Sequence, residues 1–263
     1  MRRWLAAALA LTLASVCQPA DARPLRVLSL DQCADQFALK LAPEAELTLS
    51  PRADDPDSWM RAEARGRRMA RPGLEAALMA RPDVAIRYWG GDPRLIAALE
   101  RRGVAVIAIA DATDFEGVRA NVRTAAKGLG KKGRGDDLIA AMDRRIAEAR
   151  ARPKAGRALY LTPGGFTAGK GTLIDTILTA AGWINAAAVP GFAPVALESL
   201  ILSPPRRFVL GFFEKRRNDR RGPGRHPVLR EMADGRSVQV SGALLGCPAW
   251  FVGEAVEQAS ARP

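Results

Sequence analysis

The segment T-P-G-G-F-T-A-G-K-G-T, Thr162–Thr172, contains the residue types best suited to binding chemistry. It follows an apolar run and precedes a helical pattern, and Gly164–Lys170 matches the first seven positions of a phosphate-binding loop. In such loops the next residue is Ser or Thr, whose hydroxyl binds Mg²⁺. That residue is Gly171 here. The pattern therefore argues against nucleotide hydrolysis, and we expect the loop to approach a ligand with its backbone and to present Phe166.

Aromatic residues follow other predicted strands as well. Tyr88 and Trp89 precede a Gly pair, directly after a predicted strand that ends at Ile86, and Trp250 and Phe251 lie in the last loop. Ligands of open α/β sheets bind at the carboxyl ends of the strands, and aromatic rings offer large, flat contact surfaces. We therefore predict that these rings and Phe166 face one ligand. Packing of the rings between two lobes, without a ligand, is the alternative.

Few other residues are arranged for catalysis. The single histidine, His226, lies in a loop before a helix, and no G-x-S-x-G motif occurs. Asp54, Asp55 and Asp57 share one loop, where they could bind a cation or act as acid and base, although such clusters more often form turns. The cysteines lack metal-site spacing. We predict a protein with no catalytic residues, no metal site and no cofactor.

The elements that position these residues alternate between strands and helices, which is typical of parallel sheets with crossover helices. A long charged helix, predicted at Asp136–Arg152, follows an amphipathic helix at Phe115–Leu129 and the break G-K-K-G-R-G. The predicted strands are Arg26–Leu30, Leu47–Leu49, Val84–Ile86, Val104–Ile109, Arg157–Leu161, Phe208–Leu210 and Ser237–Val240.

One unit of the chain occurs twice. L-E-A-A-L-M-A-R-P-D-V-A-I, Leu74–Ile86, returns 123 positions later (197 − 74) as L-E-S-L-I-L-S-P-P-R-R-F-V, Leu197–Val209. Each copy has a glutamate, Glu75 or Glu198, in the first turn of a predicted helix, where the helix dipole favours a carboxylate. We predict an α/β fold with two α/β lobes and parallel-type sheets, joined by a long connecting helix. The predicted boundaries are 23–115 for the N-terminal lobe, 116–155 for the connecting helical segment and 156–263 for the C-terminal lobe.

The first residues have the pattern of a secretory signal peptide, predicted at 1–22. A basic start and a short apolar run lead to an A-x-A cleavage site at Ala20–Ala22. A lipid anchor at Cys17 is the alternative, although Val16 is larger than a lipobox favours. In an oxidising compartment the two remaining cysteines, Cys33 and Cys247, can pair or stay as separate buried thiols.

The chain is basic, with a formal net charge of +12. Its arginines are scattered among acidic residues, and only Lys215–Arg221 forms a dense run, which is typical of a solvated loop. A binder of nucleic acid or of an anionic surface is one open class of function, and steep salt dependence would identify it. We expect a monomer that binds no nucleic acid.

Four motifs resemble one family over essentially the whole mature chain. They are Leu74–Asp83, Tyr88–Gly91, G-F-T-A-G-K at Gly165–Lys170, and Trp250–Phe251. With the signal peptide and the two lobes, they resemble the periplasmic substrate-binding proteins of ABC importers for cobalamin, ferric siderophores and haem, and most of all the vitamin B12 binders. The chain departs from that family at D-D-P-D and R-M-A-R-P, where aromatics are expected, and at D-Q-C-A-D in the first turn.

The resemblance implies a class III periplasmic binding protein that holds a corrinoid, siderophore or haem between its lobes and delivers it to a permease. It implies that Glu75 and Glu198 dock onto permease arginines. The ligand contacts that we assign with it are Asp31, Gln32, Tyr88, Trp89, Phe166, Trp250 and Phe251. An α/β enzyme in the periplasm, P-loop-like or hydrolytic, is the alternative.

Overall fold

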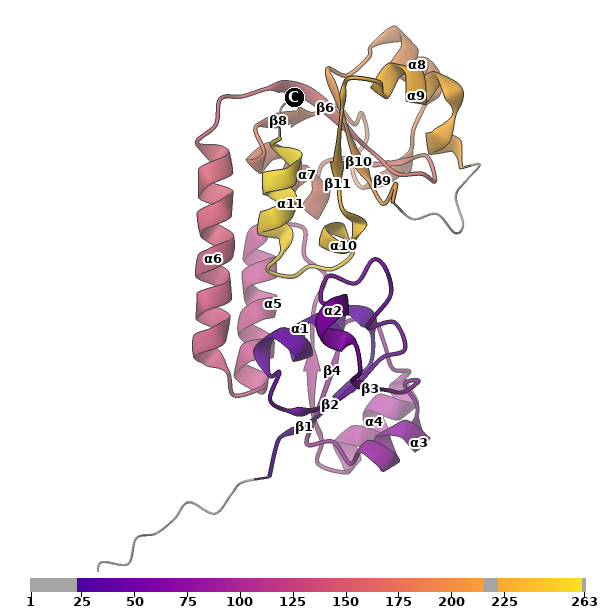
Figure 1. The fold of residues 1–263 in the computed structure, drawn as a ribbon. Helices are drawn as coiled ribbons and strands as arrows, with labels where there is room; N and C mark the ends of the chain where they lie inside the picture. The colour runs from indigo at the N-terminus through magenta and orange to yellow at the C-terminus, as the bar shows by residue number, and fades with distance from the viewer. Residues whose placement is uncertain (1–22, 215–221, 262–263) are drawn as a thin grey trace, which may run out of the picture.

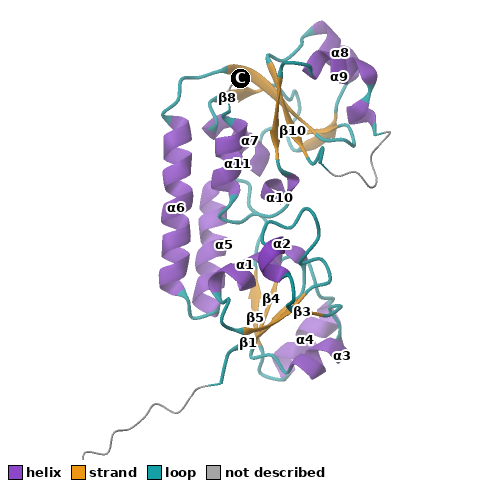
Figure 2. Ribbon diagram, in the orientation of Figure 1, coloured by secondary structure: helices purple, strands orange, loops and turns teal. Residues whose placement is uncertain are grey.

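The computed structural model describes residues 23–214 and 222–261. Two α/β lobes lie at opposite ends of the molecule, and a pair of long helices runs along one side of it (Figure 1, Figure 2). The predicted signal peptide, Cys17 and the basic run Lys215–Arg221 lie outside the described residues. Within the described residues, the helices are all too short or too polar to cross a membrane.

The first lobe is built on a parallel sheet of five strands, in the order β3-β2-β1-β4-β5. Alternate residues of its strands face opposite layers: Val27 packs with α1 and α5, and Leu28 with α3 and α4. Its elements are β1 (Arg26–Ser29), α1 (Gln32–Leu41), β2 (Glu46–Leu49), α2 (Arg61–Ala64), β3 (Arg68–Met69), α3 (Leu74–Ala80), β4 (Val84–Arg87), α4 (Pro93–Arg101) and β5 (Ala105–Ala108).

The second lobe repeats this arrangement with four parallel strands, in the order β11-β10-β6-β8. A separate antiparallel pair, β7 and β9, extends from it. Its elements are β6 (Gly156–Leu161), β7 (Phe166–Ala168), α7 (Leu173–Ala180), β8 (Trp183–Asn185), β9 (Phe192–Pro194), α8 (Leu197–Leu202), β10 (Arg207–Gly211), the 3-10 turn η1 (Pro223–Arg225), α9 (Pro227–Ala233), β11 (Ser237–Val240), α10 (Gly242–Leu245) and α11 (Val252–Ala259). Two parallel-sheet lobes joined by long helices confirm the predicted fold class.

The connection between the lobes consists of α5 (Phe115–Gly128) and α6 (Lys132–Arg150). The sequence predicted a glycine-rich break up to Gly135, and this was wrong, because α6 already begins at Lys132. A Cβ atom on Gly135 would lie 2.5 Å from the Cβ of Ala126 on α5. Glycine therefore lets the two helices pack closely, and this packing outweighs its low helix propensity.

The largest of three hydrophobic clusters extends through both lobes, and each lobe has a smaller cluster of its own. The largest cluster contains Phe37 of α1, Ile146 of α6 and Leu178 of α7, together with Trp250 and Phe251 of the last loop. The ring centroids of Phe37 and Trp250 are 5.5 Å apart. Because this core is shared, the lobes are packed against each other as well as being connected by the chain.

A disulfide bond joins Cys33 to Cys247, with 5.5 Å between their Cα atoms. Cys33 follows β1 at the start of α1, and Cys247 follows β11 and α10. The structure therefore decides between the two cysteine states that the sequence left open. It also shows that the carboxyl ends of the two sheets face each other, which is where the predicted ligand contacts were placed.

Candidate functional site

Trp89 in the first lobe and Phe166 in the second are exposed aromatic rings that come after interior strands of their sheets. Trp89 follows β4 and is 55% exposed, and Phe166 follows β6 and is 49% exposed. Tyr88, next to Trp89, is half-buried. Because the carboxyl ends of the two sheets face each other, these rings lie on the sides of the lobes that are turned towards one another.

Asp31 holds the loop that carries Trp89. Its side chain is 1% exposed, and its two carboxylate oxygens accept five backbone hydrogen bonds. The donors, at 2.7 to 3.2 Å, are the N–H groups of Cys33, Ala34, Tyr88, Trp89 and Gly90. A carboxylate so fully engaged with its own backbone has little capacity left for a ligand. The structure thus gives Asp31 a positioning role in place of the expected ligand contact.

Gln32 also differs from its expected role. It is 8% exposed, and its side-chain amide donates a hydrogen bond to the Asp57 carboxylate at 3.4 Å. It therefore links the start of α1 to the acidic loop, and little of its surface is left for a ligand.

The glycine pair after Trp89 allows the loop to turn against β1. A Cβ atom on Gly90 would lie 2.1 Å from the carbonyl oxygen of Leu30, and Gly91 has φ of +78°. Neither position accommodates an ordinary side chain. The two glycines of the Y-W-G-G motif therefore allow the turn that places Tyr88 and Trp89 at the end of β4.

The Tyr88 hydroxyl donates a hydrogen bond to the Asp111 carboxylate. Burial, and then the adjacent carboxylate, raise the pKa of Tyr88 above its usual value. The phenol is therefore neutral and donates its proton in this hydrogen bond.

Trp250 and Phe251 do not lie on an open surface. They are 7% and 1% exposed, and Phe251 packs against Trp59 with ring centroids 6.0 Å apart. The expectation that these two rings face a ligand is corrected by this burial, which matches the alternative of packing between the lobes. Both are large apolar side chains in a segment held against the first lobe by the disulfide, and burial in the shared core is their favourable state.

The glycine-rich segment does not form a phosphate loop. Phe166–Ala168 is strand β7, paired with β9. A Cβ atom on Gly169 would lie 1.7 Å from the carbonyl oxygen of Val189, and one on Gly224 would lie 2.0 Å from that of Thr162. The glycines thus permit close contact within the chain itself. Phe166 nevertheless stays exposed, as expected.

Glu75 and Glu198 lie in the first turns of α3 and α8, and both are exposed. The two helices are at opposite ends of the molecule, on the side away from α6 in the view of Figure 1. Neither carboxylate forms an ion pair within the described residues. Both are therefore free to meet a partner.

No family model matches the chain, and no curated protein matches it by sequence. Solved structures match over nearly the whole chain. The heme-binding protein BhuT, in complex with two hemes, has a TM-score of 0.67 and 24% identity, covering 89% of this chain and 97% of that one. The chain has the fold of the periplasmic binding proteins.

Two further solved structures with this periplasmic binding protein fold bind different ligands by their names. The heme-binding protein HutB of Vibrio cholerae has a TM-score of 0.71 and 17% identity, with 90% of this chain and 97% of that one covered. The vitamin B12 binding protein BtuF of the same organism has a TM-score of 0.63 and 18% identity, with 90% and 95% covered. The fold alone therefore does not select a ligand.

Within this periplasmic binding protein fold, the acidic loop and His226 have structural roles. Asp55 pairs with Arg52 at 2.9 Å, and the His226 ring nitrogen Nδ1 accepts the Val228 N–H at the start of α9. Among the described residues, no group of three or more His, Cys, Asp or Glu is placed to hold a metal ion. The aspartates stabilise a turn in this structure.

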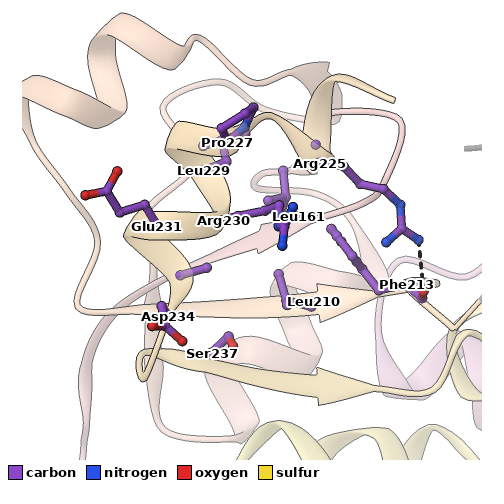
Figure 3. Close-up of a pocket in the computed structure, with 12 residues that line it drawn as sticks. Leu161, Leu210, Phe213, Arg225, Pro227, Leu229, Arg230, Glu231, Asp234 and Ser237 are labelled. Carbon is purple, nitrogen blue, oxygen red and sulfur yellow. Dashed lines mark hydrogen bonds between the residues drawn. The ribbon is translucent and has the colours of Figure 1, made fainter. Parts of the chain in front are cut away.

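A cavity of about 1080 Å³ lies in the second lobe between α9 and the sheet (Figure 3). Leu161, Leu210 and Phe213 contribute apolar surface, and Arg225 lies at one end, donating to the Phe213 carbonyl oxygen at 2.9 Å. None of the predicted ligand-binding residues lines this cavity. The sequence offered no signal for it, because it depends on how far α9 sits from the strands.

Proposed function

We propose that this chain is a periplasmic solute receptor that holds a large ligand between its two lobes and delivers it to an ABC importer. The observation that carries the proposal is the pair of exposed rings, Trp89 and Phe166, each at the carboxyl end of a central strand in lobes that face each other. The similarity of the whole chain to periplasmic binding proteins supports it. These similar structures are binding proteins, and the enzyme alternative gains no support from them.

The ligand that suits these rings is large and flat, such as a haem or a corrinoid; a ferric siderophore remains a candidate. Each well-stacked ring contributes on the order of 1 kcal/mol beyond the burial of its area. Tyr88 acts as a neutral hydrogen-bonding group in this proposal, because its hydroxyl donates to the Asp111 carboxylate. Ligand recognition then rests on stacking and hydrogen bonding.

The lobes move little when the ligand binds, in this proposal. The shared core and the Cys33–Cys247 bond both tie them together beside the ligand position. The ligand therefore enters a largely preformed space, and the entropic cost of ordering the protein on binding stays small.

Delivery uses Glu75 and Glu198. A permease built from two equivalent subunits requires two equivalent contacts on a monomeric receptor, and the repeated unit supplies one on each lobe. Carboxylates form strong, bidentate hydrogen bonds with arginines. The exposed positions of both glutamates meet this requirement.

The ligand is identified by incubating the purified mature protein with haem, cobalamin or a ferric siderophore, desalting it, and recording the visible spectrum. We expect one of the three to be retained, and Trp89→Ala or Phe166→Ala to weaken retention about fivefold or more, the equivalent of a lost stacking contact. Ile184→Ala, which truncates an exposed side chain on β8, is the matched control and leaves retention unchanged. Failure to retain any of the three would refute the proposal.

A further inference from the structure

Aliphatic side chains stand exposed beside both glutamates. On α3, Leu78 is 48% and Met79 is 67% exposed. On α8, Ile201 is 55% and Leu202 is 86% exposed. These two short helices carry five of the ten large hydrophobic side chains that are exposed in the described part of the chain. Exposed hydrophobic side chains are therefore more frequent on α3 and α8 than on the rest of the described surface.

The aliphatic pairs occupy equivalent positions in the repeat. Leu78 and Ile201 come three residues after the glutamates, and Met79 and Leu202 come four residues after them. Residues three and four apart share one face of a helix. Each helix therefore displays one patch that combines a carboxylate with two aliphatic side chains. The α3 patch is Glu75, Leu78 and Met79, and the α8 patch is Glu198, Ile201 and Leu202.

Folding does not require these side chains to be aliphatic. The only buried residue of α3 is Ala77, and that of α8 is Leu200. Single exposed hydrophobic residues are ordinary, but an exposed pair beside an exposed carboxylate, found at equivalent positions in two lobes, marks a surface that another molecule covers.

We infer that the two patches are twin contact sites in which the aliphatic pair is buried together with the glutamate by a dimeric partner. This inference rests on the proposed function, which makes the partner an importer permease. The helices that carry the patches, α3 and α8, lie at opposite ends of the molecule and on the side away from α6 in Figure 1, which is compatible with two contacts on one partner. The partner presents, twice, a cation beside an apolar surface.

The chemistry of each patch explains why both kinds of side chain are needed. Apolar contacts around an ion pair exclude water and strengthen the electrostatic attraction. Beside the α3 patch, a cavity of about 630 Å³ between α3 and α4 is lined by Leu74, Leu78 and Leu99, and it offers room for an apolar side chain of the partner. The glutamate sets the position and charge of the contact, and the aliphatic pair supplies buried area.

The test titrates the ligand-loaded receptor against its permease in lipid nanodiscs. The double variants are Leu78→Ser with Met79→Ser, and Ile201→Ser with Leu202→Ser. Each is expected to weaken binding about tenfold or more, as loss of a contact hot spot does. The matched control is Ile184→Ser with Val189→Ser, which alters side chains that are 59% and 47% exposed outside both patches. This control is expected to bind like wild type.

The outcomes separate this inference from the proposed function. If both aliphatic variants bind the permease like wild type while Glu75→Gln with Glu198→Gln weakens binding, the glutamates act alone and the inference is wrong. Absence of permease binding by a wild-type receptor that retains its ligand overturns the inference and leaves ligand capture standing. If none of the three ligands is retained, the unloaded receptor is titrated instead, and permease binding that depends on the patches then supports the inference and contradicts the proposed ligands. Circular dichroism checks that every variant is folded.

Discussion

Removing the disulfide tests how strongly it restricts the unfolded chain. The change is Cys33→Ser with Cys247→Ser, which opens a loop with a sequence separation of 214. In the chain-entropy model, closing a loop of this length lowers the conformational entropy of the unfolded chain by about 18 cal/mol/K. Without the disulfide the unfolded chain regains this entropy, so we expect the free energy of unfolding to fall by about 5 kcal/mol at 25 °C. Trp250 and Phe37 remain in contact in the folded variant, because their packing does not depend on the sulfur atoms.

Urea unfolding of the wild type and of the double variant measures this change. With a slope of about 2.5 kcal/mol/M, the midpoint should fall by about 2 M. The wild type unfolded in the presence of a reductant is the matched control, and it should behave like the double variant. Because one core spans both lobes, we expect a single transition in each case. Two free thiols in the denatured, unreduced wild type, or an unchanged midpoint, would show that the reasoning is wrong.

Three further predictions concern buried and exposed carboxylates. Asp31→Asn should lower the free energy of unfolding by about 2 kcal/mol, measured by urea unfolding, because an amide cannot accept hydrogen bonds from all the N–H groups that the carboxylate serves. The control is Asp54→Asn at an exposed position, which should change the free energy of unfolding little. Burial raises the pKa of Asp35 to about 6. The folded state therefore binds the carboxyl proton more tightly than the unfolded state does. The free energy of unfolding should fall as pH rises from about 4 to about 6, and the contribution of Asp35 should be constant above pH 6. Asp35→Asn should remove this part of the pH profile, and an unchanged profile would contradict the assignment. Glu75→Arg with Glu198→Arg should abolish uptake by cells while the ligand affinity of the purified protein stays the same, and normal uptake would exclude docking through these residues.

The repeat made the fold predictable from the sequence. Equivalent positions such as Glu75 and Glu198 established two similar lobes, and the alternation of apolar strands with helices indicated parallel sheets. These patterns are local, and local patterns survive in the folded structure when tertiary packing agrees with them. Both glutamates consequently proved to lie in first helical turns.

The side-chain environments were not predictable in the same way. A tryptophan in a loop can meet solvent, as Trp89 does, or be buried in the core shared by the two lobes, as Trp250 is, and the residue type alone does not decide between these states. Strands of three residues such as β7 carry too few positions to show a period. The partner of Cys33 is 214 residues away, so only the packing of the lobes determined it.

The last helix has a consequence for the order in which the molecule can assemble. Val252, Ala255, Val256 and Ala259 of α11 are each 0% exposed and belong to the core shared by both lobes. A chain that emerges amino terminus first, from a ribosome or an export channel, can form its first sheet early, but that core cannot close before α11 has emerged. Chains interrupted before α11 would leave apolar faces of α6 and α7 uncovered and open to proteases. Synthesis of α11 is thus the step that allows the core shared by both lobes to close.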